Sequence, residues 1–270
     1  MSGSERDHGS YDYVIAGAGS AGCVLANRLS ADPTIRVCLL EAGGRDTHPW
    51  VHIPVGYFFN FDHPRADWRY RTEPEPGLNG RVLKYPRGRV LGGSSSINGM
   101  VYIRGHALDY EGWRQLGNPG WGWSDVLPYF KRSEDQVRGP NEAHGVGGEL
   151  SVDDLRASWE ILDVFRKAAV ESGIPATDDF NGGESEGVGY FQVTQKNGRR
   201  MSRGAGVPQA GPRAAEPDRH HGKPCVAHSI TKVGGSWEIQ AGLERRSTVL
   251  QALRRPGARP GMKLMASGGN

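Results

Sequence analysis

The stretch YVIAGAGSAG, residues 13–22, decides the fold of this chain. Its first four residues are apolar and partly β-branched, which predicts a β-strand, and the pattern G-x-G-x-x-G follows at once. Small and apolar residues over 21–30 predict a helix that ends before Pro33. A second apolar run, residues 35–40, predicts another strand. The order of strand, glycine turn, helix and strand is typical of the βαβ unit that opens a dinucleotide-binding α/β fold.

The glycines of this turn suit the binding of a pyrophosphate. Gly17 permits the tight turn, Gly19 lets the backbone approach the ligand, and Gly22 lets the helix pack closely on the strand. The helix N-terminus adds N–H groups and a partial positive charge, which attract an anion. Glu41 ends the second strand, where its carboxylate can accept hydrogen bonds from ribose hydroxyls. We therefore expect a ligand with an unphosphorylated ribose; these residues alone leave both FAD and NAD open.

A glycine-rich turn without a ligand is the alternative interpretation, because the chain holds 40 glycines. The preceding strand, the following helix, the second strand and its terminal acid all occur in the expected register, which favours the dinucleotide site.

The composition is that of a protein with a core, since 37% of its 270 residues are hydrophobic. No apolar run approaches the ~20 residues of a membrane span. Residues 1–10 are polar and predict a flexible N-terminus, so a cytoplasmic protein is expected. The three cysteines are widely spaced and imply no disulfide framework. The histidines at 48, 52, 63, 106 and 144 lack metal-ligand spacing, and each is interpreted as a surface or loop residue, so no metal site is predicted.

A second informative stretch, GRVLGGSSSINGMVYIRG, spans residues 88–105. Paired glycines, three serines and an asparagine let the backbone approach a flat ligand and supply many small hydrogen-bonding groups. The stretch lacks the G-x-S-x-G order of a nucleophile elbow and has no evident His and Asp partners. The serines are therefore interpreted as a cradle and not as nucleophiles.

Together these residues resemble the glucose-methanol-choline oxidoreductases, and within them the choline dehydrogenase-like members. The resemblance rests on residues 11–44, Asp67, Trp68, 85–105, Trp121, Trp123 and 179–200, and covers roughly residues 11–202. It implies an α/β fold with a Rossmann-like FAD-binding domain, incomplete in this chain, and part of a substrate domain. The implied cofactor is FAD.

The resemblance also implies which residues hold the FAD. Those expected at the pyrophosphate and ribose are Gly17, Gly19, Ser20, Ala21, Gly22, Glu41 and Ala42. Those expected along the flavin are Val90, Gly92, Gly93, Asn98, Gly99, Met100 and Val101. Some relatives tether the flavin covalently through a histidine just before the asparagine. Ile97 stands at that position and has no nucleophilic atom, so the FAD is expected to be non-covalent.

The character of the sequence changes at Arg203. Residues 1–202 carry 22 basic and 26 acidic residues, whereas residues 203–270 carry 11 basic and 4 acidic ones, with 11 Gly and 6 Pro. This composition predicts a disordered tail. Its positive charge lacks the interleaved aromatics of a nucleic-acid site, so no nucleic-acid partner is predicted.

A frameshift would explain this change. Codons permitted for residues 203–221, read one base later, can give AARAFLKPALARPNLTVIT, which resembles the way members of the family continue after the Gly-x-Arg-x-Ser pattern at residues 198–202. We infer a one-base frameshift near Ser202, with an accidental translation after it.

The resemblance implies an oxidoreductase that moves a hydride from the CH–OH group of a small alcohol or choline-like substrate to the flavin, while a base takes the hydroxyl proton. In the family that base is a histidine in the C-terminal part. No stretch of this chain matches its motif, so no catalytic residue is assigned and the chain as written is expected to be inactive. The alternatives are a non-catalytic flavin-binding remnant and an NAD-binding Rossmann module, and residues 88–105 argue against the latter.

Overall fold

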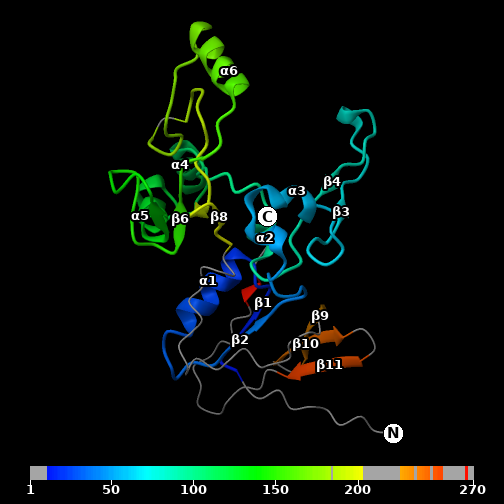
Figure 1. Cartoon of the computed structure of the whole chain (residues 1–270). Helices are drawn as coiled ribbons and strands as arrows, with labels where there is room; N and C mark the ends of the chain where they lie inside the picture. The colour runs from blue at the N-terminus through cyan, green and yellow to red at the C-terminus, as the bar shows by residue number, and fades with distance from the viewer. Residues whose placement is uncertain are drawn as a thin grey trace. The chain divides into compact units, whose positions relative to one another are not determined.

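The computed structural model describes residues 11–183 and 185–202, together with the backbone of four strands beyond them (Figure 1). The chain forms two compact units. The first comprises Met1–Ile97 and Ser202–Asn270, and the second comprises Asn98–Met201. The predicted flexible N-terminus, residues 1–10, lies outside the described residues.

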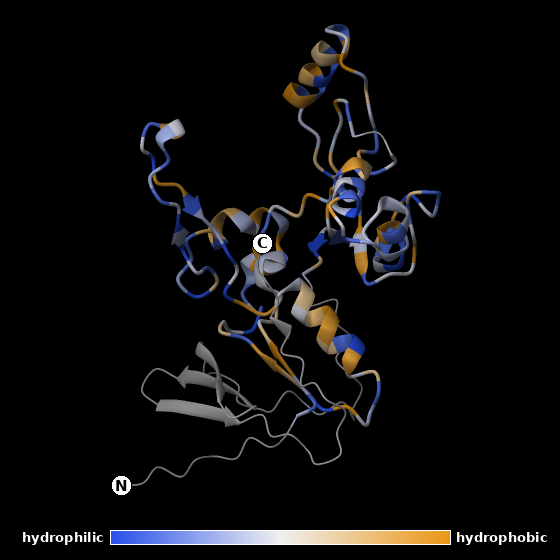
Figure 2. Ribbon diagram, turned by 180° about the vertical axis from the view of Figure 1, so that it is seen from behind, coloured by the Kyte–Doolittle hydropathy of each residue, from blue (hydrophilic) through white to orange (hydrophobic). Residues whose placement is uncertain are grey.

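The first unit begins with the predicted βαβ arrangement. β1 (Tyr13–Ala16) and β2 (Val37–Leu40) pair in parallel, and α1 (Ser20–Leu29) connects them. β2 starts two residues later than predicted, because the chain first makes a turn in which the Ile35 N–H donates to the Asp32 carbonyl at 3.0 Å. Figure 2 shows the apolar residues of both strands in orange.

Beyond residue 202, the described part of the chain contains four strands. β12 (Met265–Ala266) pairs in parallel with the free edge of β1, which gives the order β12-β1-β2. β9 (Val226–Val233), β10 (Ser236–Leu243) and β11 (Arg246–Gln251) form a separate antiparallel sheet. The sequence predicts disorder throughout residues 203–270, and this prediction is wrong for the residues that form these strands. The rest of 203–270 lies outside the described residues, and there the disorder stays a prediction.

Short elements make up the remainder of the first unit. They are α2 (Pro49–His52), η1 (Pro54–Gly56), α3 (Tyr57–Asn60), β3 (Tyr70–Arg71), η2 (Pro76–Leu78), β4 (Lys84–Tyr85) and η3 (Gly93–Ser96). β3 and β4 form a small antiparallel hairpin.

The second unit combines three helices with two small sheets. Its elements are α4 (Ala107–Gln115), α5 (Trp123–Ser133), β5 (Glu134–Gln136), β6 (Leu150–Val152), α6 (Glu160–Glu171), β7 (Gln195–Lys196) and β8 (Arg199–Arg200). β5 and β6 pair in parallel, and β7 and β8 pair antiparallel. The β7–β8 turn places Asn197 at φ 53° and Gly198 at φ 73°, as a two-residue hairpin turn requires.

The cap of α5 differs from the sequence pattern. Serine is a preferred N-cap residue, but Ser124 lies inside the helix. The helix begins at Trp123, and Gly122 occupies the N-cap position. The Asp125 carboxylate accepts a hydrogen bond from the Gly122 N–H at 3.0 Å, so the acid satisfies a backbone donor that a capping serine would not reach.

The apolar face of α6 is exposed within the described residues. Leu162 is 43% exposed and Phe165 is 66% exposed, and Figure 2 shows orange residues along this helix. In the part of the chain that the structure describes, no helix is both long and apolar enough to cross a membrane. The cytoplasmic location stays a prediction.

Candidate cofactor-binding site

Three segments of the first unit converge at the N-terminus of α1. They are residues 17–22, 41–44 and 88–93. Backbone hydrogen bonds hold them together: the Gly92 N–H donates to the Ala18 carbonyl at 2.8 Å, and the Leu91 N–H donates to the Gly44 carbonyl at 2.9 Å. The first two segments meet because β1 and β2 are parallel, so their carboxyl ends lie at the same edge of the sheet.

Two positions of the glycine turn are unsuited to side chains, one because of close packing and one because of its backbone conformation. A Cβ atom on Gly22 would lie 1.9 Å from the Gly17 carbonyl oxygen, so a larger residue would push α1 away from β1. Gly17 itself has φ 95°, in the left-handed region that favours glycine. Both glycines can be recognised from the sequence, because the G-x-G-x-x-G pattern is one short contiguous stretch.

Gly19 differs from the other two glycines, because space remains beside it. A Cβ atom on Gly19 would meet no other atom within 4 Å. Behind Gly19 the packing is close, since a Cβ on Gly93 would approach the Gly19 Cα to 2.8 Å. No side chain caps α1 at Gly19, its first turn holds no acid, and Ser20 and Ala21 are exposed. The N-terminus of α1 can therefore accommodate an anionic group.

Glu41 connects two of the converging segments. Its Oε2 accepts a hydrogen bond from the Ala18 N–H and its Oε1 accepts one from the Gly43 N–H, each at 2.8 Å. Burial raises the pKa of the Glu41 carboxyl, while these hydrogen bonds and the charge of Arg89 act in the opposite direction. Each carboxylate oxygen can accept a further hydrogen bond, as a ribose hydroxyl would provide. The sequence pattern did not reveal that Glu41 also fixes the turn.

The serines of η3 hold their own segment in shape. Their hydrogen bonds run from the Gly88 N–H to Ser94 Oγ (3.1 Å), from Ser95 Oγ to the Gly92 carbonyl (2.7 Å) and from Ser96 Oγ to the Leu91 carbonyl (2.7 Å). These bonds agree with the interpretation of the serines as a cradle, since each hydroxyl is engaged with nearby backbone.

Two residues beside the cradle are part of the core. Val90 is 4% exposed and Ile97 is 2% exposed, and they form a buried cluster with Ala66. The Val90 side chain therefore packs within the core, and its place along the flavin stays a prediction. Ile97 is buried among these aliphatic neighbours.

Four of the predicted flavin-lining residues, Asn98–Val101, belong to the second unit. Asn98 and Gly99 are exposed there, whereas Met100 is buried and adopts φ 64°. The Asn98 Oδ1 accepts hydrogen bonds from the Met100 N–H at 3.2 Å and from Arg200 Nη1 at 2.8 Å. The other ten predicted residues all lie in the first unit.

Arg200 was not predicted as a site residue. It is 3% exposed, and burial lowers its pKa to about 10. The contact to Asn98 joins residues 102 positions apart, which no local pattern reports. The sequence signal that includes Arg200 is the Gly-x-Arg-x-Ser pattern at residues 198–202. That pattern was interpreted only as the end of the resemblance.

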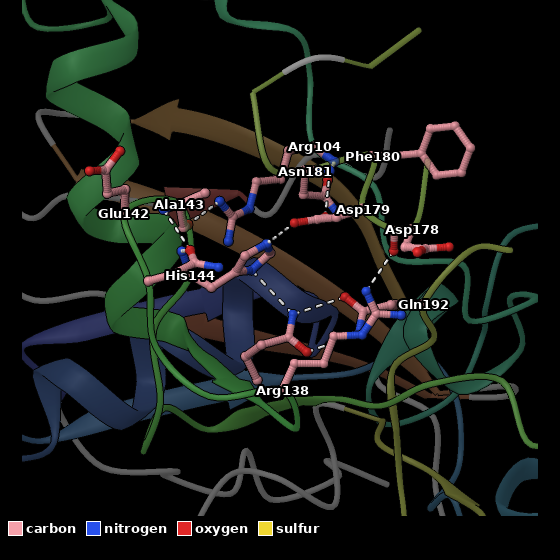
Figure 3. A network of polar contacts seen from close by, with 12 residues as sticks. Arg104, Arg138, Glu142, Ala143, His144, Asp178, Asp179, Phe180, Asn181 and Gln192 are labelled. Carbon is pink, nitrogen blue, oxygen red and sulfur yellow. Dashed lines mark hydrogen bonds and ion pairs between the residues drawn. The ribbon is translucent and has the colours of Figure 1, made fainter. Parts of the chain in front are cut away.

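His144 lies on a loop, as the sequence predicted, but it is buried, with 2% exposure. Its ring contacts Glu134 and Asp179, and Figure 3 shows the contact with Asp179. Among the described residues, no three His, Cys, Asp or Glu side chains gather in a way that could hold a metal ion.

The first unit thus combines a glycine turn, an open helix N-terminus and an acid at the second strand. The profile described as GMC oxidoreductase matches residues 11–210. The chain belongs to the GMC oxidoreductase family. The match extends eight residues past the predicted boundary at 202, into residues that lie outside the described ones. The boundary itself and the frameshift stay predictions.

Individual GMC relatives are similar over the same region. An alcohol dehydrogenase [acceptor] from Pseudomonas putida is 52% identical over 193 residues, which is 71% of this chain and 35% of the relative. The mitochondrial choline dehydrogenase of Homo sapiens is 45% identical over 208 residues, which is 74% of this chain and 35% of the relative. The chain therefore spans about a third of the length of these relatives.

Solved structures share the fold. Pyridoxine 4-oxidase from Mesorbium loti superimposes with a TM-score of 0.80 at 32% identity, covering 90% of this chain and 48% of that one. A FAD-dependent oxidoreductase from Chaetomium thermophilum gives a TM-score of 0.76 at 26% identity, with 90% and 44% covered. The predicted α/β fold is confirmed, and the family supports FAD as the cofactor.

Proposed function

We propose that residues 11–202 bind FAD, with its pyrophosphate at the N-terminus of α1 and its adenosine ribose at Glu41. The observation that carries the proposal is the free space beside Gly19, at a helix N-terminus without a side-chain cap, whereas Gly22 and Gly93 pack closely against backbone. A phosphate there would be favoured by N–H groups and by the helix dipole. Glu41 supports an unphosphorylated ribose, because a carboxylate would repel a 2′-phosphate.

We propose that the flavin is held non-covalently, with Asn98–Val101 and the segment 90–93 along it. Ile97 supports this mode, because an aliphatic side chain buried to 2% exposure cannot form a bond to the cofactor. FAD would supply a hydride acceptor. The described residues would bind it, orient it and exclude water, and none of them is assigned to take the proton of a substrate hydroxyl.

For the complete protein we propose an oxidoreductase acting on the CH–OH group of a small alcohol or choline-like substrate. Support comes from relatives named alcohol dehydrogenase and choline dehydrogenase. A second candidate for the 270-residue chain is a non-catalytic flavin-binding remnant, which the shifted reading of residues 203–221 favours. Anaerobic addition of choline or simple alcohols to the FAD complex separates the two, since only a dehydrogenase bleaches its flavin.

The binding proposal can be tested by fluorescence titration of the chain with FAD. The variant Gly19→Val places a branched side chain in the proposed pyrophosphate space, and the affinity should fall at least ~100-fold, because about 2.7 kcal/mol of anion contacts would be lost. Gly77→Val is the matched control: Gly77 is exposed in η2, and a Cβ there also meets nothing within 4 Å. Equal affinities for both variants would refute the assigned site.

A further inference from the structure

The polar cluster around His144 lies within the second unit and includes none of the residues assigned to FAD. His144 is on the loop between β5 and β6, and its ring lies between the carboxylates of Glu134 and Asp179. Figure 3 shows the contact with Asp179. Nδ1 lies 3.0 Å from both carboxylate oxygens of Glu134, and Nε2 lies 2.9 Å from Asp179 Oδ2. The side chains of His144 and Glu134 are 2% and 0% exposed, so water does not screen their contact.

This geometry favours the doubly protonated form of the ring. A neutral imidazole has one N–H donor, and its other nitrogen carries a lone pair. Since carboxylates face both nitrogens of His144, a neutral ring would direct one lone pair at a carboxylate oxygen. Two N–H donors satisfy both contacts, and the imidazolium form supplies them. The Glu134 bond raises the pKa of His144, burial opposes this rise, and the Asp179 bond adds to it.

Charge balance favours the same form. The charged groups that face this site are Glu134 of β5, Asp179 of the loop after α6, and Arg104, whose Nη2 donates to Glu134 Oε2 at 2.9 Å. If His144 is neutral, the carboxylates of Glu134 and Asp179 and the guanidinium of Arg104 leave one negative charge uncompensated. If His144 is an imidazolium, the charges balance. Burial alone would raise the pKa of Glu134, but the bonds from His144 and Gly145 and the charge of Arg104 lower it.

The remaining neighbours of the ring are uncharged. Gln136 Nε2 lies 3.1 Å from His144 Nδ1, and Gln136 and Gln192 exchange two amide hydrogen bonds of 2.9 Å. Gln192 donates in turn to Asp154 at 2.8 Å, and Arg138 pairs with that carboxylate. The Gln136–Gln192 amide pair therefore lies between the ring and the Asp154–Arg138 ion pair.

The cluster fixes the segment that follows Val101. Arg104 donates to the Ala143 carbonyl at 2.7 Å, which joins this segment to the His144 loop. The Asn181 Oδ1 accepts from the Arg104 N–H at 2.8 Å, and the Asn181 N–H donates to Asp179 Oδ1 at 2.8 Å. Asp179 thus connects the histidine ring to the backbone of residues 102–104.

We propose that His144 is a pH-sensitive lock: as a buried imidazolium between Glu134 and Asp179 it holds the loop 141–145, the loop 177–182 and the segment 102–104 together, and its deprotonation releases them. The lock does not depend on FAD, so its test is independent of the proposed binding function. A histidine whose pKa is raised by folding contributes stability that is complete below its unfolded pKa of ~6.5 and is lost as the pH rises through the folded pKa. The second unit should therefore loosen on the alkaline side.

The direct test is NMR of the 270-residue chain with 15N-labelled histidine rings. We expect both ring nitrogens of His144 to carry protons at about pH 7.5, above the ordinary histidine pKa. We also expect hydrogen exchange of the amides of residues 102–104 to accelerate, beyond the intrinsic pH effect, as the ring deprotonates. A His144 ring with one protonated nitrogen at that pH would overturn the proposal.

Variants supply a second readout. Asp179→Asn removes one carboxylate from a site where that side chain is 29% exposed, so the protein should fold and His144 should titrate at lower pH. The stability of the unmodified chain in urea should decline between about pH 6.5 and pH 9, and this decline should disappear in His144→Gln. His52→Gln is the control. His52 lies on α2 in the first unit, so this variant should keep the decline. An unchanged His144 titration in Asp179→Asn would contradict the lock.

Discussion

Glu41 illustrates how one side chain serves both the fold and the proposed site. Its two oxygens accept the Ala18 and Gly43 N–H groups, so the turn and the segment after β2 depend on the same carboxylate. In Glu41→Gln one of these N–H groups would face an amide NH2. We expect a loss of ~1–3 kcal/mol of stability, the cost of a buried donor without an acceptor, and weaker FAD binding.

Urea unfolding followed by tryptophan fluorescence measures this loss. Glu73→Gln, at an exposed position of the same unit, serves as the control and should change stability little. A Glu41→Gln variant as stable as this control would show that the carboxylate does not hold the turn.

Arg200 offers a second prediction at a single residue. Its Nη1 donates to the Asn98 Oδ1 at 2.8 Å and so orients the amide that we propose lies along the flavin. A lysine places its ammonium differently and lacks the planar donor pair. In Arg200→Lys we expect FAD affinity to fall about 5-fold, equivalent to ~1 kcal/mol, the value of one hydrogen bond.

The neighbouring residue provides the matched comparison for Arg200. Arg199 lies on the same strand β8 but is exposed, so Arg199→Lys should bind FAD like the unmodified chain. Isothermal titration of both variants measures the difference. Equal affinities would remove Arg200 from the site.

The contact between β1 and α1 depends on Gly22. Since a Cβ there would lie 1.9 Å from the Gly17 carbonyl oxygen, Gly22→Ala must displace the helix and should cost ~1–3 kcal/mol, as overpacking does elsewhere. Gly19→Ala adds the same methyl group to open space but places a poorer residue at the N-cap, so it should cost about 0.5 kcal/mol, less than Gly22→Ala. Thermal denaturation of both variants gives the comparison, and similar melting temperatures would show that α1 does not pack as described.

The sequence predicted the elements whose causes are local. β1, α1 and β2 follow from an apolar run, a glycine turn and a second apolar run, all within 28 residues from Tyr13 to Leu40. Residue types alone favour Ser124 as the N-cap of α5, because they do not reveal the competing hydrogen bond between Asp125 and Gly122. The His144 cluster was missed for a stronger reason: its partners at 134 and 179 are 45 positions apart, and only tertiary packing brings them together.

At the scale of the whole molecule, two predictions concern the region after Ser202. If a one-base shift near that codon separates the chain from its family, sequencing the gene should find an extra or missing base there. A chain with the frame restored should carry a sequence similar to AARAFLKPALARPNLTVIT in place of residues 203–221, and that region should resist protease longer than the present tail. An intact frame in the gene would contradict this interpretation of the tail.

The central claim is that residues 11–202 form the FAD-binding part of a GMC oxidoreductase, and the absorbance spectrum of the purified chain tests it most directly. The account predicts flavin bands on the folded protein after gentle purification or addition of FAD, and release of the flavin into the supernatant on acid precipitation, because Ile97 provides no covalent tether. A folded protein that takes up no flavin when FAD is supplied would contradict the claim, and flavin that stays with the precipitate would contradict the non-covalent mode.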